Sequence, residues 1–290
     1  MGPPVLSVIV VSYRSREYLA GCLESLFERG GVADPEVVVV DNGSGDGSVE
    51  MLRSKFPGVA VFPNPDNRGF ARAANQGLRR AAGRYRMLLN PDMVVQEGAL
   101  AGLVGFLEAN PDCGMAGGNG LDPSGRPQPQ FTRSIPTPIT ALYHFSGLDR
   151  LFPKSRRFGR YNCTYADRET SFDVEALSGS CIVVRSEALE RVGLLDERFG
   201  MYAEDLDWCL RFARAGWRVS YVHTARFIHF HGRSSRKNLL WTRRQFYLTM
   251  RSFYKKNLRD SYPGVVNLLV DAAVLFALGL GLLRAHFSRS

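Results

Sequence analysis

Short apolar runs alternate with amphipathic stretches through the first part of the chain. Residues 5–11 and 36–40 are nearly continuous runs of β-branched residues, which is typical of strands covered on both faces of a sheet. Residues 17–27 carry apolar side chains three and four positions apart, as one face of a helix does. This alternation predicts an α/β fold with a mostly parallel central sheet and helices on both faces. By the same criteria we expect further strands at 59–62 and 85–89 and further helices at 48–56, 70–82 and 97–109.

The pattern is less regular in the second half of the chain. Residues 121–173 are rich in proline and basic residues, and we expect them to form loops and short elements that cover a site. Regularity returns with strands expected at 181–184 and 219–222 and helices expected at 186–192 and 208–215. We therefore expect two halves of one domain, residues 1–120 and 121–259, followed by a C-terminal helical segment at 260–290.

A long apolar segment lies close to the C-terminus. Residues 264–283 are mostly apolar and are interrupted by Asn267 and Asp271. The length suits a membrane span, but a charged Asp in the apolar core of a bilayer costs about 2.5–3.5 kcal/mol. Because the segment follows a strongly basic stretch, we expect a helix in the membrane interface or an unusual span. The alternative is packing against the domain or a partner subunit.

Charge is distributed unevenly along the chain. The 290 residues are 45% hydrophobic and 22% charged, which excludes intrinsic disorder, and the formal net charge is +9. Residues 226–259 contain ten Lys or Arg and no acid, and Asp149 is the only acid in residues 126–160. Such stretches suit the phosphates of nucleotides, nucleic acids or anionic lipids, although a solvated basic face is the simpler interpretation.

Cysteine usage and the N-terminal pattern indicate the compartment. The five cysteines show no CxxC spacing, which favours reduced thiols in the cytoplasm. The chain enters the first expected strand at Val5 without the pattern of a secretory signal. We therefore expect a cytoplasmic protein.

Polar motifs follow two of the expected strands. Asp41 and Asn42 come directly after the second strand, and ligands of open parallel sheets bind beyond the carboxyl ends of the strands. Asn90 and Asp92 end the fourth strand, where a carboxylate can hold Mg²⁺ or Mn²⁺ together with substrate phosphates. Both motifs are also ordinary turn formers.

Three acids and two histidines supply further candidates for chemistry. Glu204, Asp205 and Asp207 stand at an expected helix start, where carboxylates are common as caps, but where one of them can also act as a general base. Asp207 is spaced to pair with Arg211 on the same helix, which leaves Glu204 and Asp205 for chemistry. His229 and His231 are either structural or metal-binding, since imidazole suits Mn²⁺.

Taken in order, these segments resemble the family 2 glycosyltransferases, which have the Rossmann-like A-type nucleotide-sugar fold, and within them the bacterial rhamnosyltransferase-like branch. The resemblance covers roughly residues 5 to 256. One departure is Asn90, which stands where the familiar DxD motif has Asp, so the site has one charge fewer and a metal-independent variant stays open. The matching segments are residues 7–13, 40–44, 67–71 with Asn75 and Gly77, 90–92, 178–180, 199–207 and 229–234.

The resemblance implies a role for each matching position. Asp205 is expected to be the catalytic base, and Glu204 to contact the acceptor or the donor sugar. Asp92 is expected to bind the divalent metal, Mg²⁺ or Mn²⁺, with His229 as a further ligand and His231 as the fallback. The expected nucleotide- and donor-binding residues are Ser12, Tyr13, Asp41, Asn42, Asn67, Gly69, Phe70, Asn75 and Asn90. The expected acceptor-side residues are Ser178, Gly179 and Asp207.

The activity implied by the resemblance is an inverting, metal-dependent transfer from a dTDP-, UDP- or GDP-sugar, with rhamnose preferred. The acceptor would be a glycan or a polyprenyl-diphosphate-linked sugar in cell-surface polysaccharide synthesis. The first half of the domain would bind the nucleotide sugar and the second half the acceptor, at the cytoplasmic face of the membrane. We keep a homodimer open as the assembly.

Other classes of protein fit the sequence less well. A nucleotidyltransferase is expected to carry a basic, glycine-rich loop after the first strand, whereas residues 12–15 contain no glycine. A nucleic-acid-binding protein would explain the net charge of +9, but no recognised motif of that class is present. A dinucleotide oxidoreductase needs GxGxxG after the first strand, which is also missing.

Overall fold

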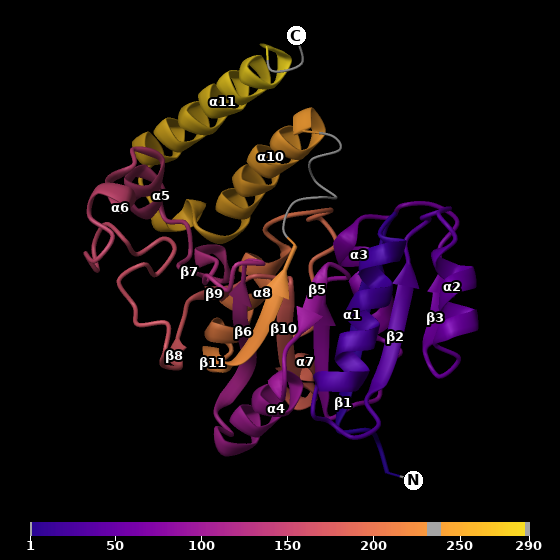
Figure 1. Ribbon diagram of the computed structural model, residues 1–290. Coiled ribbons are helices and arrows are strands. Elements are labelled where there is room, and N and C mark those ends of the chain that lie inside the picture. Colours follow the sequence, from indigo (N-terminus) through magenta and orange to yellow (C-terminus); the bar gives the residue numbers. More distant parts are fainter. Residues whose placement is uncertain (1, 231–238, 288–290) are drawn as a thin grey trace.

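A mixed β-sheet runs through the protein, whose computed structural model describes residues 2–230 and 239–287 (Figure 1). The strands of this sheet are β1 (Leu6–Ser12), β2 (Glu36–Asp41), β3 (Ala60–Pro63), β4 (Tyr85–Leu89), β5 (Met93–Val95), β6 (Cys113–Leu121), β8 (Phe172–Asp173), β10 (Cys181–Arg185) and β11 (Arg218–His229). Their order is β3-β2-β1-β4-β10-β6-β11-β5, with β8 paired to β11. Strands β3, β2, β1 and β4 are parallel, whereas β10 is antiparallel to both of its neighbours. A small separate sheet pairs β7 (Thr132–Arg133) with β9 (Ala176–Leu177).

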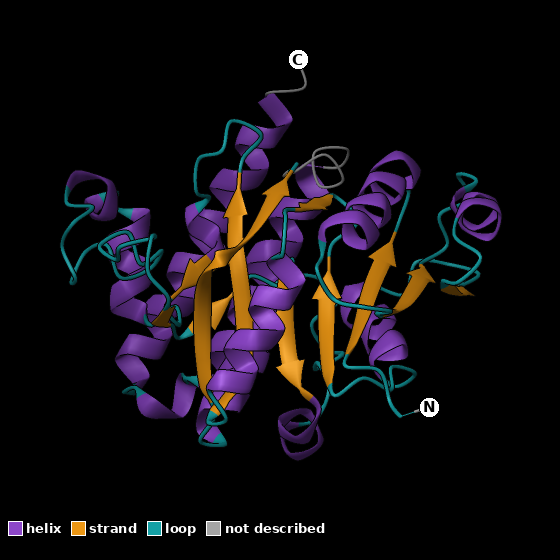
Figure 2. Ribbon diagram, turned by 60° about the horizontal axis from the view of Figure 1, so that its bottom comes forward, coloured by secondary structure: helices purple, strands orange, loops and turns teal. Residues whose placement is uncertain are grey.

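Helices cover both faces of the sheet (Figure 2). Alternate residues of β1 serve the two faces, since Val8 and Val10 join the core that includes residues of α1, α2 and α4, whereas Ile9 joins the core of α3, α7 and α8. This arrangement explains the continuous apolar runs and confirms the predicted α/β class. The helices are α1 (Arg16–Arg29), α2 (Ser48–Lys55), α3 (Phe70–Leu78), α4 (Ala99–Ala109), α5 (Pro138–Phe145), α6 (Leu148–Leu151), α7 (Ser186–Val192), α8 (Glu204–Arg214), α10 (Leu239–Asn257) and α11 (Gly264–Phe287), with single 3₁₀ turns at Pro129–Phe131 and Arg259–Ser261.

Strand β6 is buried although its sequence is poor in the residues that favour strands. Its glycines make room for aromatic side chains of neighbouring elements. A Cβ atom on Gly118 would lie 2.4 Å from the ring of Phe227, and one on Gly120 would lie 2.1 Å from the ring of Phe131. Packing of these rings therefore determines the composition of the strand, and propensity does not indicate it.

The two C-terminal helices pack against each other as a hairpin (Figure 1). The two polar interruptions of the apolar segment have partners inside this hairpin. Asp271 accepts hydrogen bonds from Arg251 at 2.6 Å and Arg259 at 3.3 Å, and Asn267 accepts one from the Tyr254 hydroxyl at 2.6 Å. Within the described residues, α11 is the one helix long and apolar enough to cross a membrane, and 6% of its most apolar window is buried.

Candidate active site

The carboxylate of Asp41 lies at the carboxyl end of β2, beside the end of β1. Its side chain is buried, and the oxygen Oδ2 accepts a hydrogen bond from the Ser44 amide at 3.1 Å. The other oxygen, Oδ1, is buried and has no hydrogen-bond partner among the described residues. A buried acceptor of this kind indicates a missing partner, which a bound ligand would supply.

Asn42 braces the loop that leads into α3. Its Nδ2 donates to Asn67 Oδ1 at 2.9 Å, and its Oδ1 accepts from the Arg68 amide at 3.1 Å and from Asn64 at 3.2 Å. These bonds tie the Asn42 side chain to the loop that is predicted to bind the donor. The sequence-based prediction for Asn42 itself is a direct contact with the donor. Asn67 itself is exposed at the surface of this loop.

Gly69 joins that loop to the segment before α8. It has a φ of +82°, and a Cβ atom there would lie 2.9 Å from the carbonyl oxygen of Gly200. The next residue, Phe70, donates its amide to the same carbonyl at 2.8 Å. Only glycine allows this close approach of two loops without strain.

Ser12 and Tyr13 continue β1 at the same edge of the sheet. The Ser12 hydroxyl is buried and hydrogen-bonded to the hydroxyl of Ser15 at 3.0 Å, whereas the Tyr13 side chain is exposed. The next residue, Arg14, has a φ of +51° and donates its amide to Ser44 Oγ at 3.0 Å. This contact joins the loops after β1 and β2 around Asp41.

The two predicted metal-binding residues lie together. Asp92 Oδ1 is 3.4 Å from His229 Nε2, and the Nδ1 atom of the same ring is 3.3 Å from Gln128 Oε1. Two ligands at about 2.1 Å from an octahedral cation would stand about 3 Å apart, so this pair fits a divalent ion. Among the described residues no third His, Cys, Asp or Glu joins the pair, so phosphate oxygens and water would supply the other ligands. His231, the fallback ligand, lies outside the described residues.

Asp205 is held at the start of α8 by a strained turn. Tyr202 and Ala203 have φ values of 69° and 65°, a conformation that is uncommon for residues other than glycine and that concentrates at functional sites. The Oδ2 atom of Asp205 accepts from Arg133 at 2.5 Å and from the Gly179 amide at 3.0 Å. The predicted base and the predicted acceptor-side Gly179 are therefore in direct contact.

A chain of neighbouring contacts connects Asp205 to the Asp92–His229 pair. The segment 178–180 includes Gly179, which holds Asp205, and Ser180, whose carbonyl accepts the Asn90 amide at 2.9 Å. Asn90 Nδ2 also donates to Ser180 Oγ at 3.2 Å, and Ser178 contacts the same hydroxyl at 3.1 Å. Since Asn90 is two residues from Asp92, the fold brings the predicted base close to the predicted metal-binding residues.

Glu204 lies beside Asp205 and has different surroundings. Its side chain is buried, and its Oε2 atom has no hydrogen-bond partner in the part of the chain that the structure describes. Burial and the neighbouring charge of Asp205 raise the pKa of Glu204 to about 8, and the charge of Arg133 opposes this shift. At neutral pH Glu204 therefore holds a proton and can donate a hydrogen bond.

Glu204→Gln is expected to remove a pH dependence of stability. The folded protein keeps the Glu204 proton up to about pH 8, whereas an ordinary glutamate loses it near 4.5. Between these values the unfolded state binds fewer protons, so the free energy of unfolding falls as pH rises. Urea denaturation at pH 5.5 and 7.5 should show the Gln variant gaining on the wild type at the higher pH. Equal gaps at both values would mean that Glu204 is ionised throughout.

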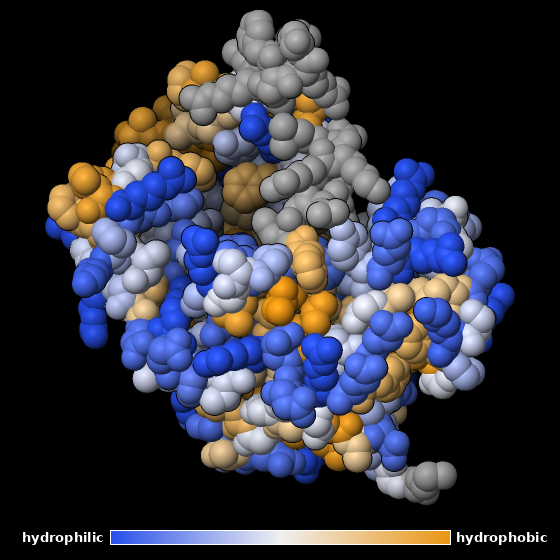
Figure 3. Space-filling model, viewed as in Figure 1, coloured by the Kyte–Doolittle hydropathy of each residue, from blue (hydrophilic) through white to orange (hydrophobic). Residues whose placement is uncertain are grey.

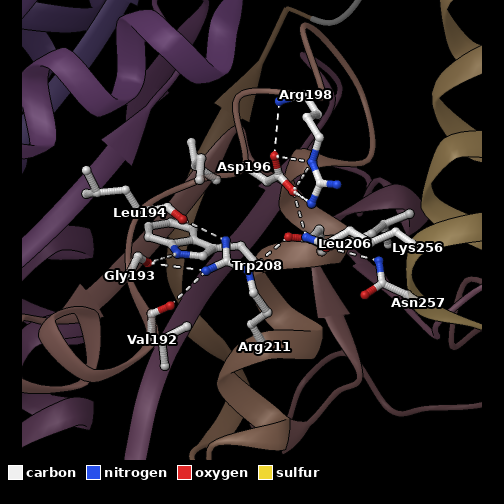
Figure 4. Close-up of polar contacts among 12 residues, drawn as sticks. Val192, Gly193, Leu194, Asp196, Arg198, Leu206, Trp208, Arg211, Lys256 and Asn257 are labelled. Carbon is white, nitrogen blue, oxygen red and sulfur yellow. Dashed lines mark hydrogen bonds and ion pairs between the residues drawn. The ribbon is translucent and has the colours of Figure 1, made fainter.

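Asp207 is buried near the start of α8 and forms ion pairs with Arg211 and Lys256. Arg211 donates to Asp207 Oδ2 at 2.9 Å, which confirms the predicted pair, and Lys256 and Asn257 donate to Oδ1 at 2.6 and 3.0 Å. Arg211 also donates to the Leu194 carbonyl, as Figure 4 shows, so α8, α10 and the loop after α7 are held together. The predicted acceptor contact of Asp207 is not supported, because its side chain is fully buried among these partners.

Asn75 has a similar structural part on α3. Its Nδ2 donates to the Leu195 carbonyl at 2.9 Å and to Glu197 at 3.0 Å, and its Oδ1 accepts the Leu195 amide at 3.0 Å. The predicted donor contact of Asn75 is not supported, since these bonds to the loop after α7 occupy the amide.

Asp207→Ala is expected to destabilise the fold by about 3–5 kcal/mol, because it leaves the cations of Arg211 and Lys256 without their buried partner. Chemical denaturation measures this loss. The matched control is Glu187→Ala, whose exposed pair with Arg191 has the same spacing and should contribute less than about 1 kcal/mol. Similar effects of the two substitutions would contradict the structural role of Asp207.

The sequence of the chain is similar to those of known glycosyltransferases. The sequence model of the family described as Glycosyl transferase family 2 matches residues 7–193. The chain is 30% identical over 245 residues to N-acetylglucosaminyl-diphospho-decaprenol L-rhamnosyltransferase of Mycobacterium tuberculosis, which covers 80% of this chain and 78% of that protein. It is 25% identical over 230 residues to the low-salt glycan biosynthesis hexosyltransferase Agl10 of Haloferax volcanii, with 77% and 66% covered.

Solved structures share the fold. A mannosyltransferase from Pyrobaculum calidifontis, solved with GDP-Man and Mn²⁺, has a TM-score of 0.61 at 20% identity and covers 97% of this chain and 72% of its own. A fragment of S. aureus TarS has a TM-score of 0.57 at 20% identity, with 100% and 73% covered. The overall fold of the chain is thus shared with these solved structures.

Proposed function

Because the chain belongs to glycosyl transferase family 2, we propose that it transfers a sugar from a nucleotide diphosphate to an acceptor hydroxyl with inversion at the anomeric carbon. The observation that carries this proposal is the path of contacts from Asp205 through Gly179 and Ser180 to Asn90, which stands two residues before Asp92. It supports one site in which a base acts on the acceptor hydroxyl and a metal-binding group acts on the diphosphate of the donor.

The proposed mechanism needs one base. Asp205 removes the proton of the acceptor hydroxyl as its oxygen attacks the anomeric carbon, a contribution of about 10²–10⁴-fold in rate. The bond to the diphosphate breaks in the same step, and no covalent sugar–enzyme intermediate is needed. Glu204 donates a hydrogen bond from its protonated carboxyl to the acceptor or donor sugar. On the nucleotide side, Asp41 Oδ1 accepts a hydrogen bond from the nucleoside.

Asp92 and His229 would hold a divalent cation, Mg²⁺ or Mn²⁺. When bound, such an ion would neutralise the charge that develops on the leaving diphosphate. The relatives support this part of the proposal, since one solved mannosyltransferase contains Mn²⁺ with its donor and another structure, of GalNAc-T7, contains UDP and Mn²⁺.

The substrate proposal is a dTDP-rhamnose donor and a polyprenyl-diphosphate-linked acceptor. It is supported by the mycobacterial relative, whose name specifies an L-rhamnosyltransferase acting on N-acetylglucosaminyl-diphospho-decaprenol. The exposed apolar helix α11 fits an acceptor at a membrane, and we assign the protein to its cytoplasmic face. In this scheme residues 1–120 bind the nucleotide sugar and residues 121–259 carry the base and bind the acceptor.

A thermal-shift panel of dTDP, UDP and GDP, each with and without Mn²⁺, tests the proposal. A nucleotide at about a hundred times its Kd stabilises the fold by about 2.7 kcal/mol, which is readily measured. We expect dTDP to give the largest shift, and the shift to grow with Mn²⁺. A larger shift with UDP or GDP would assign that nucleotide to the donor in place of dTDP. No shift with any nucleotide in folded protein would contradict the transferase assignment.

A further inference from the structure

Helix α5 carries a stripe of exposed apolar side chains. Ile139, Leu142 and Phe145 are spaced three residues apart, so they share one side of the helix, and they are 50%, 60% and 63% exposed. Leu151 and Phe152, at the end of α6, are 69% and 47% exposed. Five large apolar residues within fourteen positions form a patch that a soluble surface rarely presents without a partner.

Exposed charges next to this patch are positive. Arg150, Lys154 and Arg156 lie at the surface, and in the described part of the chain no carboxylate forms an ion pair with them. The one acid of the segment, Asp149, is buried and bonded to His144 at 2.5 Å, so it does not offset these charges at the surface. Apolar side chains beside basic ones match the acyl region and the phosphates of an anionic bilayer, and each Lys or Arg near such a surface favours binding.

The patch lies at the same end of the protein as the apolar helix α11. In Figure 1, α5 and α6 stand near the start of α11, away from the N-terminus, and Figure 3 shows apolar side chains over both regions on the face in view. On α11, Val265, Leu268 and Phe276 are 66–69% exposed. One flat partner surface of large extent would cover both regions, which favours a lipid surface as the occupant.

A short series of contacts connects this patch to the predicted base. The ring of His144 on α5 stacks on Tyr161 with centroids 4.3 Å apart, and the Tyr161 carbonyl accepts the Ser134 amide at 2.9 Å. The preceding residue, Arg133, holds Asp205. The position of α5 is therefore coupled to that of the catalytic carboxylate through residues that are mostly buried.

We propose that α5 and α6 form a second membrane-docking element, which binds an anionic phospholipid leaflet together with α11 and orients Asp205 toward an acceptor at the bilayer. The inference rests on the proposed function for its purpose, since docking serves a lipid-linked acceptor. It adds a contact surface in the segment 138–156 that α11 alone does not provide. The contacts through Tyr161, Ser134 and Arg133 connect this surface to the active site.

Site-specific fluorescence in the full chain tests the element. All five native cysteines are buried, so a single exposed cysteine can be labelled selectively with an environment-sensitive dye. Leu142→Cys is the test variant. Phe27→Cys is the matched control, because Phe27 is a large apolar residue that is 47% exposed on α1, outside the proposed surface. Vesicles of phosphatidylglycerol and of phosphatidylcholine are the probes, with flotation reporting total binding.

A blue shift of the dye at position 142 with phosphatidylglycerol vesicles, absent at position 27, is the expected result. Leu142→Ser combined with Phe145→Ser should reduce the fraction bound to these vesicles at least threefold, whereas Val5→Ser combined with Phe27→Ser should leave it unchanged. Failure to bind, or binding by flotation without a shift at position 142, would overturn the inference. A shift that appears with protein concentration alone would do so too, because the patch would then bind a second copy of the chain.

A separate assay keeps this outcome apart from the proposed function. Transfer to a water-soluble acceptor with a short lipid does not need docking, so the Leu142→Ser and Phe145→Ser double variant should retain wild-type kcat on it. If the wild type itself transferred no sugar to this acceptor, the proposed function would be contradicted. The result on lipid binding would still hold.

Discussion

Asp205→Asn is expected to lower kcat by at least about a thousandfold while nucleotide binding stays within twofold of the wild type. The amide has nearly the shape of the carboxylate and can still accept a hydrogen bond from Gly179, but it cannot take a proton from the acceptor. Nucleotide binding should survive because Asp41 and Asp92 are untouched. The measurement is single-turnover transfer at saturating donor, alongside a thermal shift with dTDP and Mn²⁺.

The control for this prediction is an acid outside the site. Asp112→Asn removes an exposed carboxylate that pairs with Arg218, and it should change neither kcat nor nucleotide binding. Circular dichroism checks that both variants are folded, since Asp205 also pairs with Arg133. If Asp205→Asn retained even a tenth of the wild-type kcat, another group would be the base.

The part of this site that the sequence predicted follows from the physics of parallel strands. Strand β1 has a continuous apolar sequence because both faces of the sheet are covered, with Val8 in one core and Ile9 in the other. The carboxyl ends of such parallel strands lie at one edge of the sheet. The position of Asp41 at this edge could therefore be predicted from the strand pattern alone. The proximity of Asp92 and His229 could not be predicted in this way, because it depends on β11 extending to His229 and pairing with β5. Strand 219–222 was predicted too short to show this.

The part that the sequence did not predict depends on contacts between distant segments. Arg133 lies in a proline-rich stretch without periodicity, and its contact with Asp205 joins residues 72 positions apart. Strand β6 was not predicted because its glycines, which make room for the rings of Phe131 and Phe227, have a low strand propensity. Asn75 matches the family pattern although its amide bonds to the loop after α7, since a family motif contains structural positions as well as functional ones.

Asp92→Asn is the second substitution with a large expected effect, because it should raise the Mn²⁺ concentration needed for the gain in nucleotide binding that Mn²⁺ gives. A divalent cation contributes several kcal/mol of stabilisation to a leaving diphosphate, so transfer should fall at least about a hundredfold. Asp92 would hold the cation through its carboxylate, and an amide oxygen is a weaker ligand than a carboxylate. The measurement is the thermal shift with dTDP at increasing Mn²⁺, compared between variant and wild type.

His229→Gln separates the two residues of the pair. Its amide can still bond to Gln128, so the local fold should persist, but it replaces the imidazole that lies 3.4 Å from Asp92. If both residues bind the cation, both variants should need more Mn²⁺, with Asp92→Asn affected more because it also removes a charge. A Mn²⁺ response that is unchanged in both variants would place the cation elsewhere, and no Mn²⁺ response even in the wild type would indicate transfer without a metal. That second outcome would agree with the charge already missing at Asn90, and it would leave the diphosphate to basic side chains.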